Sequence, residues 1–293
     1  MSGEFTSTAE AGATRPSGAG EKALVVIEPG KGWTSLRLSE LWEYRELLYF
    51  LTWRDVKVRY KQAVLGVAWA VLQPVLTMVV FTVIFNRLLH VQSQGAAPYA
   101  VFSFVGLLPW QLFSASLAKA GTSLVGNANL LTKVYFPRLV IPVSAVLSGL
   151  VDFVISFLVL LALMAYYGMA PTLNALWLPV FVLLAMATAL AFGLWLSALN
   201  VLYRDVQYLI PFLVQLWMYV SPVAYSANIV GGKWRVIYGL NPLAGVIQGF
   251  RWALLGGNPP GLLLGVSVAM VVVLLVSGLF YFKRMERAFA DVV

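Results

Sequence analysis

The stretch VGNANLLTKVYFPRLVIP, residues 125–142, interrupts a chain that is otherwise rich in Leu, Val, Phe and Trp. Residues 127–138 place two Asn, a Lys, an Arg and a Pro between two long apolar runs. Such polar groups are costly in hydrocarbon and are typical of a connection that lies outside it. The interpretation of this stretch therefore depends on where the apolar runs around it lie.

The amino-acid composition indicates whether the chain lies in water or in a lipid membrane. Hydrophobic residues make up 60% of the 293 residues and charged residues only 11%, against roughly 25% charged in a soluble domain. A membrane helix needs about 20 apolar residues, and the alternation of a β-barrel strand is missing. We predict an all-α integral membrane protein with six transmembrane helices. They cover residues 64–85, 99–118, 139–167, 176–199, 208–227 and 262–282.

The orientation follows from the Lys and Arg residues of the connections, because cytoplasmic loops carry the excess. One side holds Arg54, Lys57, Arg59, Lys61, Lys133, Arg138, Arg204, Lys283, Arg284 and Arg287. The other side holds only Arg87, Lys233, Arg235 and Arg251. Both termini are therefore expected in the cytoplasm, in a multi-pass protein. The net charge of +8 is explained by this topology and by anionic lipid, without a nucleic-acid partner.

Four regions are expected along the chain. Residues 1–34 are rich in Ser, Thr, Gly, Ala and Glu and predict a mobile cytoplasmic tail. In residues 35–62, Leu and Trp alternate with charges, which favours an amphipathic helix in the inner interface; a soluble helix packed on a cytoplasmic domain is the alternative. Residues 63–285 form the six-span domain, and residues 286–293 form a cytoplasmic tail.

The connection between the last two predicted spans is too long and too apolar for a plain loop. Asn241 can cap a helix that begins at Pro242, and Gly256 with Gly257 can end it. A second short helix is expected at about residues 233–238. Two short helices here indicate a re-entrant hairpin on the outer side; a pair of helices lying on the outer leaflet is the alternative.

Residues capable of catalysis are scarce. Asp152 is the only acidic residue inside a predicted span, and His90 is the only histidine. The chain has no Cys, no GxxxxGK[ST] phosphate-binding loop and no HExxH zinc motif. We therefore expect neither an enzyme nor a bound metal or cofactor. Asp152 is expected to pair with a basic or hydroxyl group across helices, with Lys119 as a candidate.

The opening stretch can now be interpreted as a short cytoplasmic helix. Its apolar residues follow helical spacing and are Leu130, Leu131, Val134 and Tyr135. Asn127 or Asn129 can cap it, Lys133 suits the dipole at its end, and Pro137 forces a turn before the next span. It forms either a knob that docks into a partner or a turn that lies on lipid. Residues 200–207, with Arg204 and Asp205, suggest a second, smaller contact.

Several segments together resemble one family. They are WRDVKVRYKQAVLGVAWAVLQP (53–74), GLLPWQLF (106–113), NANLLTKVYFPR (127–138), SALNVLYRDVQYLIPFLVQLWMYVSPV (197–223) and LNPLAGVIQGFRWALLG (240–256). In this order they resemble the ABC-2 type permeases of bacterial polysaccharide export. The most similar subgroup is the O-antigen or lipopolysaccharide-transport permeases, with capsule and teichoic-acid permeases as relatives. The resemblance covers about residues 35–285.

The resemblance implies a homodimer in the bacterial inner membrane, paired with two copies of a separate ATPase that carries the ATP and Mg. It implies that residues 127–136 are a coupling helix leading into Pro137 and Arg138, and that residues 200–205 are a second contact with the ATPase. It also implies an outer gate helix at residues 241–256, including Asn241, Pro242, Phe250, Arg251 and Trp252. The implied substrate is a glycan on undecaprenyl pyrophosphate.

A glycan path has physical demands that the sequence can meet, because aromatic rings stack weakly on sugars. Candidates for the channel are Trp69, Phe81, Phe85, Trp110, Phe113, Trp217, Tyr219 and Tyr225; packing or an interfacial aromatic belt is the alternative for each. Candidates for the entrance of the lipid pyrophosphate are Arg54, Lys57, Arg59 and Lys61; charge that only sets topology is the alternative.

Three rival functions stay open. An ATPase-independent carrier or lipid flippase would need an ion site, for which only Asp152 is available. A membrane glycosyltransferase would need acidic cytoplasmic loops, and the inner loops offer only Asp205. An ABC-2 exporter of capsule, teichoic acid, drugs or small lipids is a rival within the same family.

Overall fold

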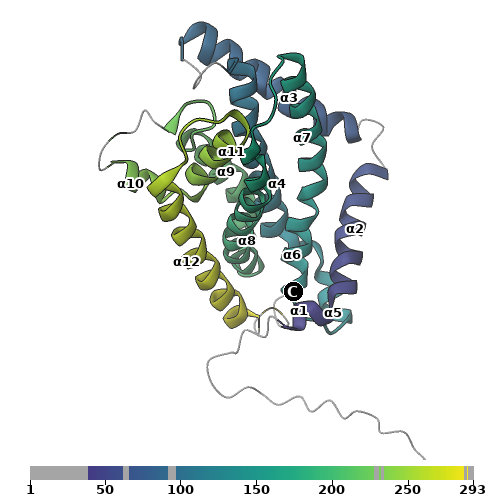
Figure 1. The fold of residues 1–293 in the computed structure, drawn as a ribbon. Helices are drawn as coiled ribbons and strands as arrows, with labels where there is room; N and C mark the ends of the chain where they lie inside the picture. Colours follow the sequence, from purple (N-terminus) through teal and green to yellow (C-terminus); the bar gives the residue numbers. More distant parts are fainter. Residues whose placement is uncertain are drawn as a thin grey trace, which may run out of the picture. The chain divides into compact units, whose positions relative to one another are not determined.

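The computed structural model describes residues 39–61, 66–91, 97–227, 231, 234–286 and 289. The predicted tail at residues 1–34, the first residues of the interface helix and most of the C-terminal tail lie outside this part. The regular elements of the described residues are all helices (Figure 1). They are α1 (Ser39–Glu43), α2 (Arg45–Lys61), α3 (Gly66–Phe81), the π-helix η1 (Thr82–Leu88), α4 (Tyr99–Gly126), α5 (Ala128–Lys133), α6 (Val140–Leu147), α7 (Gly149–Tyr166), the 3-10 helix η2 (Leu173–Trp177), α8 (Leu178–Leu202), α9 (Val206–Val220), α10 (Trp234–Gly239), α11 (Pro242–Leu255) and α12 (Gly261–Met285).

Five helical runs are long and apolar enough to cross a membrane. They are Ala68–Leu88, Tyr99–Gly126, Val140–Tyr166, Leu173–Leu202 and Gly261–Met285. The prediction of an all-helical membrane protein is therefore confirmed, with five long spans and one shorter apolar helix in the described residues.

The shorter helix is α9, where a full span was predicted over residues 208–227. It has 15 residues, or about 22 Å at 1.5 Å per residue, less than the roughly 30 Å of a hydrocarbon core. The helix stops because Pro222 disfavours helical backbone at the residue before it, and Ser221 is extended with φ −90° and ψ 145°. The remaining predicted residues form a buried irregular segment.

The helices α3, α6, α7 and α8 pack around α4, which makes its most extensive contacts with α8, while α12 packs against α8 and α11 (Figure 1). Small residues bring these two helices close together: a Cβ on Gly193 would lie 2.7 Å from the Cβ of Ala120. Such small-residue contacts let helix backbones approach closely in membranes. The predicted third span is two helices, α6 and α7, which meet at Ser148.

Buried apolar side chains form two cores. The main core holds residues of α4, α6, α7, α8 and α11, with Phe113, Ala189 and Phe250 fully buried. The second core lies where α1, α5 and the end of α12 gather, at the lower end of Figure 1. It consists of Leu51, Leu124, Phe136, Val140, Ile141, Leu194, Ala198, Val201, Phe282 and Phe289.

Candidate functional site

The predicted coupling segment, residues 127–138, lies beside the second core. Its helix α5 is present, but the predicted apolar stripe is divided. Leu130 and Leu131 are half-buried and pack against the second core. Val134 and Tyr135 follow the helix and are 52% and 85% exposed. Two of the four predicted residues therefore also pack against the chain's own core, and the docking role of the segment stays a prediction.

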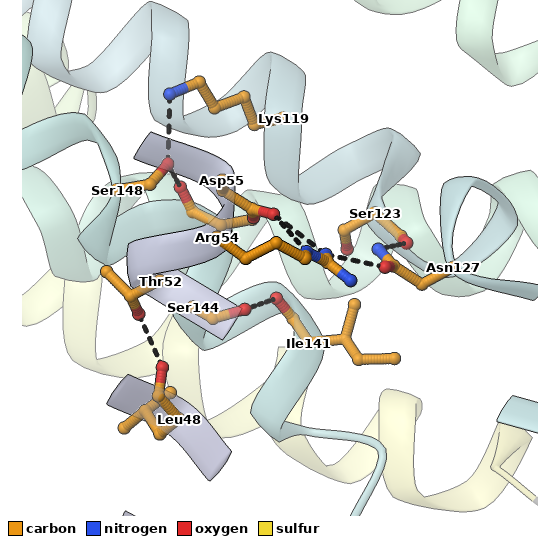
Figure 2. Close-up of polar contacts among 11 residues, drawn as sticks. Leu48, Thr52, Arg54, Asp55, Lys119, Ser123, Asn127, Ile141, Ser144 and Ser148 are labelled. Carbon is orange, nitrogen blue, oxygen red and sulfur yellow. Dashed lines mark hydrogen bonds and ion pairs between the residues drawn. The ribbon is translucent and has the colours of Figure 1, made fainter. Parts of the chain in front are cut away.

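Asn127 does not cap α5, contrary to expectation. It makes no side-chain capping hydrogen bond; its Oδ1 instead accepts a hydrogen bond of 2.8 Å from Arg54 Nη2. Its Nδ2 donates to the Ser123 carbonyl at 2.8 Å. Arg54 also contacts Asp55 at 2.8 Å, as Figure 2 shows. Asn127 therefore joins the start of α5 to α2.

The end of the coupling segment is also fixed. Phe136 is buried in the second core, a role that the sequence analysis missed. Arg138 donates a hydrogen bond to the Glu286 carbonyl near the end of α12, and its guanidinium lies 5.8 Å from the centre of the Phe289 ring. A cation suits the negative end of a helix dipole. Between these two fixed ends, residues 132–135 are exposed.

The second predicted contact lies in the turn between α8 and α9. Tyr203, Arg204 and Asp205 are all exposed there. Neither Arg204 nor Asp205 forms an ion pair within the part of the chain that the structure describes. The turn is therefore available on the surface of the subunit.

The four basic residues predicted at the lipid-pyrophosphate entrance separate into two pairs. Arg54 and Arg59 are engaged by other side chains of the subunit. Lys57 and Lys61 are exposed and form no ion pair with any described residue. Two of the four residues are therefore held by contacts within the subunit, and the role of the cluster at the lipid-pyrophosphate entrance stays a prediction.

The Asp152 carboxylate is contacted by three side chains, two from α2 and one from α4. Arg59 forms an ion pair with its carboxylate and Tyr60 donates a hydrogen bond to it. Burial raises the pKa of the Tyr60 phenol more than Arg59 lowers it, so the hydroxyl keeps the proton that it donates. Lys119 Nζ lies 3.8 Å from the same carboxylate and donates to Ser148 Oγ at 3.0 Å (Figure 2). The expected pairing of Asp152 with Lys119 is confirmed, but Arg59 and Tyr60 were not anticipated.

The aromatic residues predicted to line a glycan path are not on one surface. Trp110 and Phe113 are buried in the main core, so they pack between helices and do not reach a channel. Trp217 is half-buried; its ring centre lies 4.6 Å from that of Phe192, and its Nε1 donates to Asn241. Trp69 and Tyr219 are exposed, while Phe81, Phe85 and Tyr225 are half-buried.

The predicted outer helices are present as α10 and α11. The Asn241 side chain accepts a hydrogen bond from the Leu243 N–H, so its capping role is confirmed, and Pro242 is the first helical residue. Gly256 ends α11 with φ 79°, a left-handed conformation that favours glycine. Trp252 is half-buried and Phe250 is fully buried.

Arg251, which was predicted on the outer side, has a buried side chain that is only 1% exposed. Its Nη2 and Nη1 donate to the carbonyls of Val223 and Tyr225 at 2.7 and 2.9 Å. Its guanidinium lies 3.7 Å from the centre of the Phe102 ring, a close cation–π contact. Tyr99 donates to the intervening Ala224 carbonyl at 2.6 Å. These side chains satisfy the backbone that becomes irregular where α9 stops.

No group of three or more His, Asp or Glu residues that could hold a metal ion occurs in the described ranges. The polar contacts of this site join helices to one another and contain no arrangement of a nucleophile with a base.

Comparisons with known proteins agree with this architecture. Residues 46–255 match the family described as ABC-2 type transporter. The O-antigen export system permease protein RfbA of Myxococcus xanthus is 34% identical over 254 residues, which are 85% of this chain and 96% of that protein. The protein of the same name from Klebsiella pneumoniae is 30% identical, over 85% of this chain and 95% of that protein. The polysialic acid transport protein KpsM of Escherichia coli is 23% identical, over 80% and 92%. The chain therefore belongs to the ABC-2 type transporter family, as a multi-pass permease subunit and not as an enzyme.

Proposed function

We propose that the chain is the membrane subunit of an exporter that moves a polyprenyl-pyrophosphate-linked polysaccharide of the O-antigen type across the bacterial inner membrane. The observation that carries this proposal is the similarity to two O-antigen export permeases over at least 95% of their length. A homodimer of this chain works with two copies of a separate ATPase, which binds ATP and Mg. Both termini lie in the cytoplasm.

The coupling function falls to the exposed part of residues 127–138. Lys133, Val134 and Tyr135 are exposed, while the ends of the segment contact α2 and α12. An exposed aromatic on a fixed frame is a suitable anchor for a partner protein. The exposed turn at Arg204 and Asp205 supplies the second, smaller contact with the same ATPase.

The residues proposed for the pyrophosphate entrance and the glycan path are those predicted side chains that keep some exposure to the surroundings. Lys57 and Lys61 are free to attract the pyrophosphate at the inner leaflet, where each basic residue contributes about 1 kcal/mol. Trp69, Phe81, Phe85, Tyr219 and Tyr225 are the aromatic residues that can meet the glycan. The hairpin of α10 and α11 forms the outer gate, which is fixed to the subunit through Asn241 and Arg251.

The proposal is tested by deleting the gene in its native host, restoring it with an affinity-tagged copy and purifying the complex. We expect loss and recovery of surface polysaccharide, and co-purification of an ATPase and a polyprenyl-linked sugar. The purified chain without its partner should bind no ATP analogue. Normal surface polysaccharide in the deletion strain, or nucleotide binding by the chain alone, would overturn the proposal.

A second candidate is the export of a capsular polysaccharide by the same mechanism. The similarity to the polysialic acid transport protein favours it, at a lower identity of 23%. The chemical analysis of the co-purified glycan distinguishes the two.

A further inference from the structure

We infer that α2 is a strut, a helix that transmits movement from the coupling segment to the first turn of α7, and that Asp152 is the positioning residue at its inner end. This inference rests on the proposed function, because the movement comes from the partner ATPase. It assigns a coupling role to contacts that lie away from the ATPase-facing surface.

The first end of the strut is the contact between Arg54 and Asn127. Asn127 ends α4 and begins α5, so it lies at the hinge of the coupling segment. Its side chain holds the Ser123 carbonyl on one side and Arg54 on the other (Figure 2). A shift of α5 therefore pulls directly on α2.

The second end of the strut lies five residues later, at Arg59 and Tyr60. Both side chains reach Asp152, which is in the first turn of α7. The carboxylate is about one turn from Ser148, where α6 ends and α7 begins. Because α2 is one continuous helix between its two contacts, a displacement at Arg54 reaches the first turn of α7 without passing through the main core.

The charges around Asp152 explain why its contact with α2 is stable but can still be broken. Arg59 and Lys119 both face the single carboxylate of Asp152, so Asp152 stays paired with Lys119 if α2 moves away. The three side chains are each between about one quarter and one third exposed, which keeps the pair weaker than a fully buried one. Apart from these polar contacts, α2 packs into the second core through Leu51, while Tyr49, Phe50 and Trp53 on its other side are exposed.

The test removes the Arg59 guanidinium and the Tyr60 hydroxyl, and keeps the ion pair between Asp152 and Lys119. The variant is Arg59→Gln with Tyr60→Phe, studied in the complex with the ATPase. A matched control on the same helix is Arg45→Gln with Tyr49→Phe, because the polar and ring contacts of Arg45 with described residues are with nearby Trp42 and Tyr49 is exposed. Hydrogen exchange of residues 45–61 reports directly on whether α2 stays attached.

We expect amide exchange in α2 to rise by about fivefold in the variant, with exchange in α8 unchanged. The ATPase should still co-purify and hydrolyse ATP, while surface polysaccharide falls severalfold. The control should match the parent in all five measurements. If the double variant does not fold, Tyr60→Phe alone keeps the ion pair and should show the same changes at smaller size.

A second arm tests the other end of the strut. Asn127→Leu removes the acceptor for Arg54, whereas Asn127→Asp keeps it, so only Asn127→Leu should uncouple hydrolysis from export. Unchanged exchange in α2 of the double variant, or faster exchange with normal export, would overturn the inference. Failure of the proposed function gives a different result, since the parent chain itself would then show no ATPase and no polysaccharide, while the exchange measurement would still report on α2.

Discussion

The two places where the membrane helices are interrupted handle polar groups in opposite ways. At residues 127–138 the polar side chains lie at the edge of the subunit and join separate helices, and the tip at Tyr135 is exposed. At residues 221–227 the interruption is enclosed, and Arg251 with Tyr99 satisfies its carbonyls. Half-exposed contacts can break and re-form, whereas a buried cation without its acceptors is very costly. The contacts that hold the first region are therefore less costly to lose than those that hold the second.

The largest effect should come from the enclosed region. Arg251→Met removes the donors to Val223 and Tyr225 and leaves their carbonyls buried without partners, at a cost of about 3 kcal/mol or more. We expect little folded protein, measured by the monodisperse fraction after detergent extraction and by its melting temperature. Arg251→Lys should lie between Arg251→Met and the parent. If Arg251→Met melts at the parent temperature, the enclosed region is not fixed by this side chain.

The next effect should come from the exposed tip. Tyr135→Ala should leave the melting temperature unchanged, because the side chain packs little within the subunit, but weaken association with the ATPase by about 2 kcal/mol. Affinity for the ATPase in nanodiscs measures this. Thr132→Ala, an exposed substitution on the same segment, is the control. Equal affinities for the two variants would mean that the tip touches no partner.

A smaller effect is expected at the fixed end of the coupling segment. Arg138→Gln weakens the hydrogen bond to the Glu286 carbonyl and removes the contact with the Phe289 ring, and should destabilise the subunit by about 1 kcal/mol. The melting temperature should fall while the ATPase still binds. Glu286→Gln retains the backbone carbonyl and should change stability less. A greater loss in Glu286→Gln would contradict this assignment of the acceptor.

The smallest effect is expected for Lys133→Ala, which removes an exposed charge and should change ATPase affinity by less than about 1 kcal/mol. Raising the salt concentration should change the affinity of the parent only slightly. A loss as large as that of Tyr135→Ala would show that charge, and not the aromatic side chain, dominates docking.

Local sequence rules predicted the elements whose causes are local. Apolar length predicted the long spans, and the capping of α11 by Asn241 was predictable because its partner, Leu243, is two residues away. The contacts of the site were not predictable in this way. Arg54 and Asn127 are 73 residues apart, and Arg59 and Asp152 are 93 apart. A lone carboxylate in a span indicated that a cation must face it, but only the fold selects which one.

Arg251 illustrates the same limit from the other side. By sequence it follows Phe250 in an apolar helix near predicted loops, which suggested an outer charge. Its real partners are carbonyl groups that become available only because α9 stops at Val220. Every residue type has a backbone carbonyl, so the sequence does not show which carbonyls are left without a helical partner. Such a hydrogen-bond acceptor therefore cannot be found from composition or spacing.

The close contact of α4 with α8 has a mechanical consequence. Where Gly193 meets Ala120, no flexible side chains separate the two backbones, so relative sliding would force atoms into overlap. These two helices should therefore move as one rigid unit during each transport cycle, and relative movement within the subunit should occur at its margin, in α2.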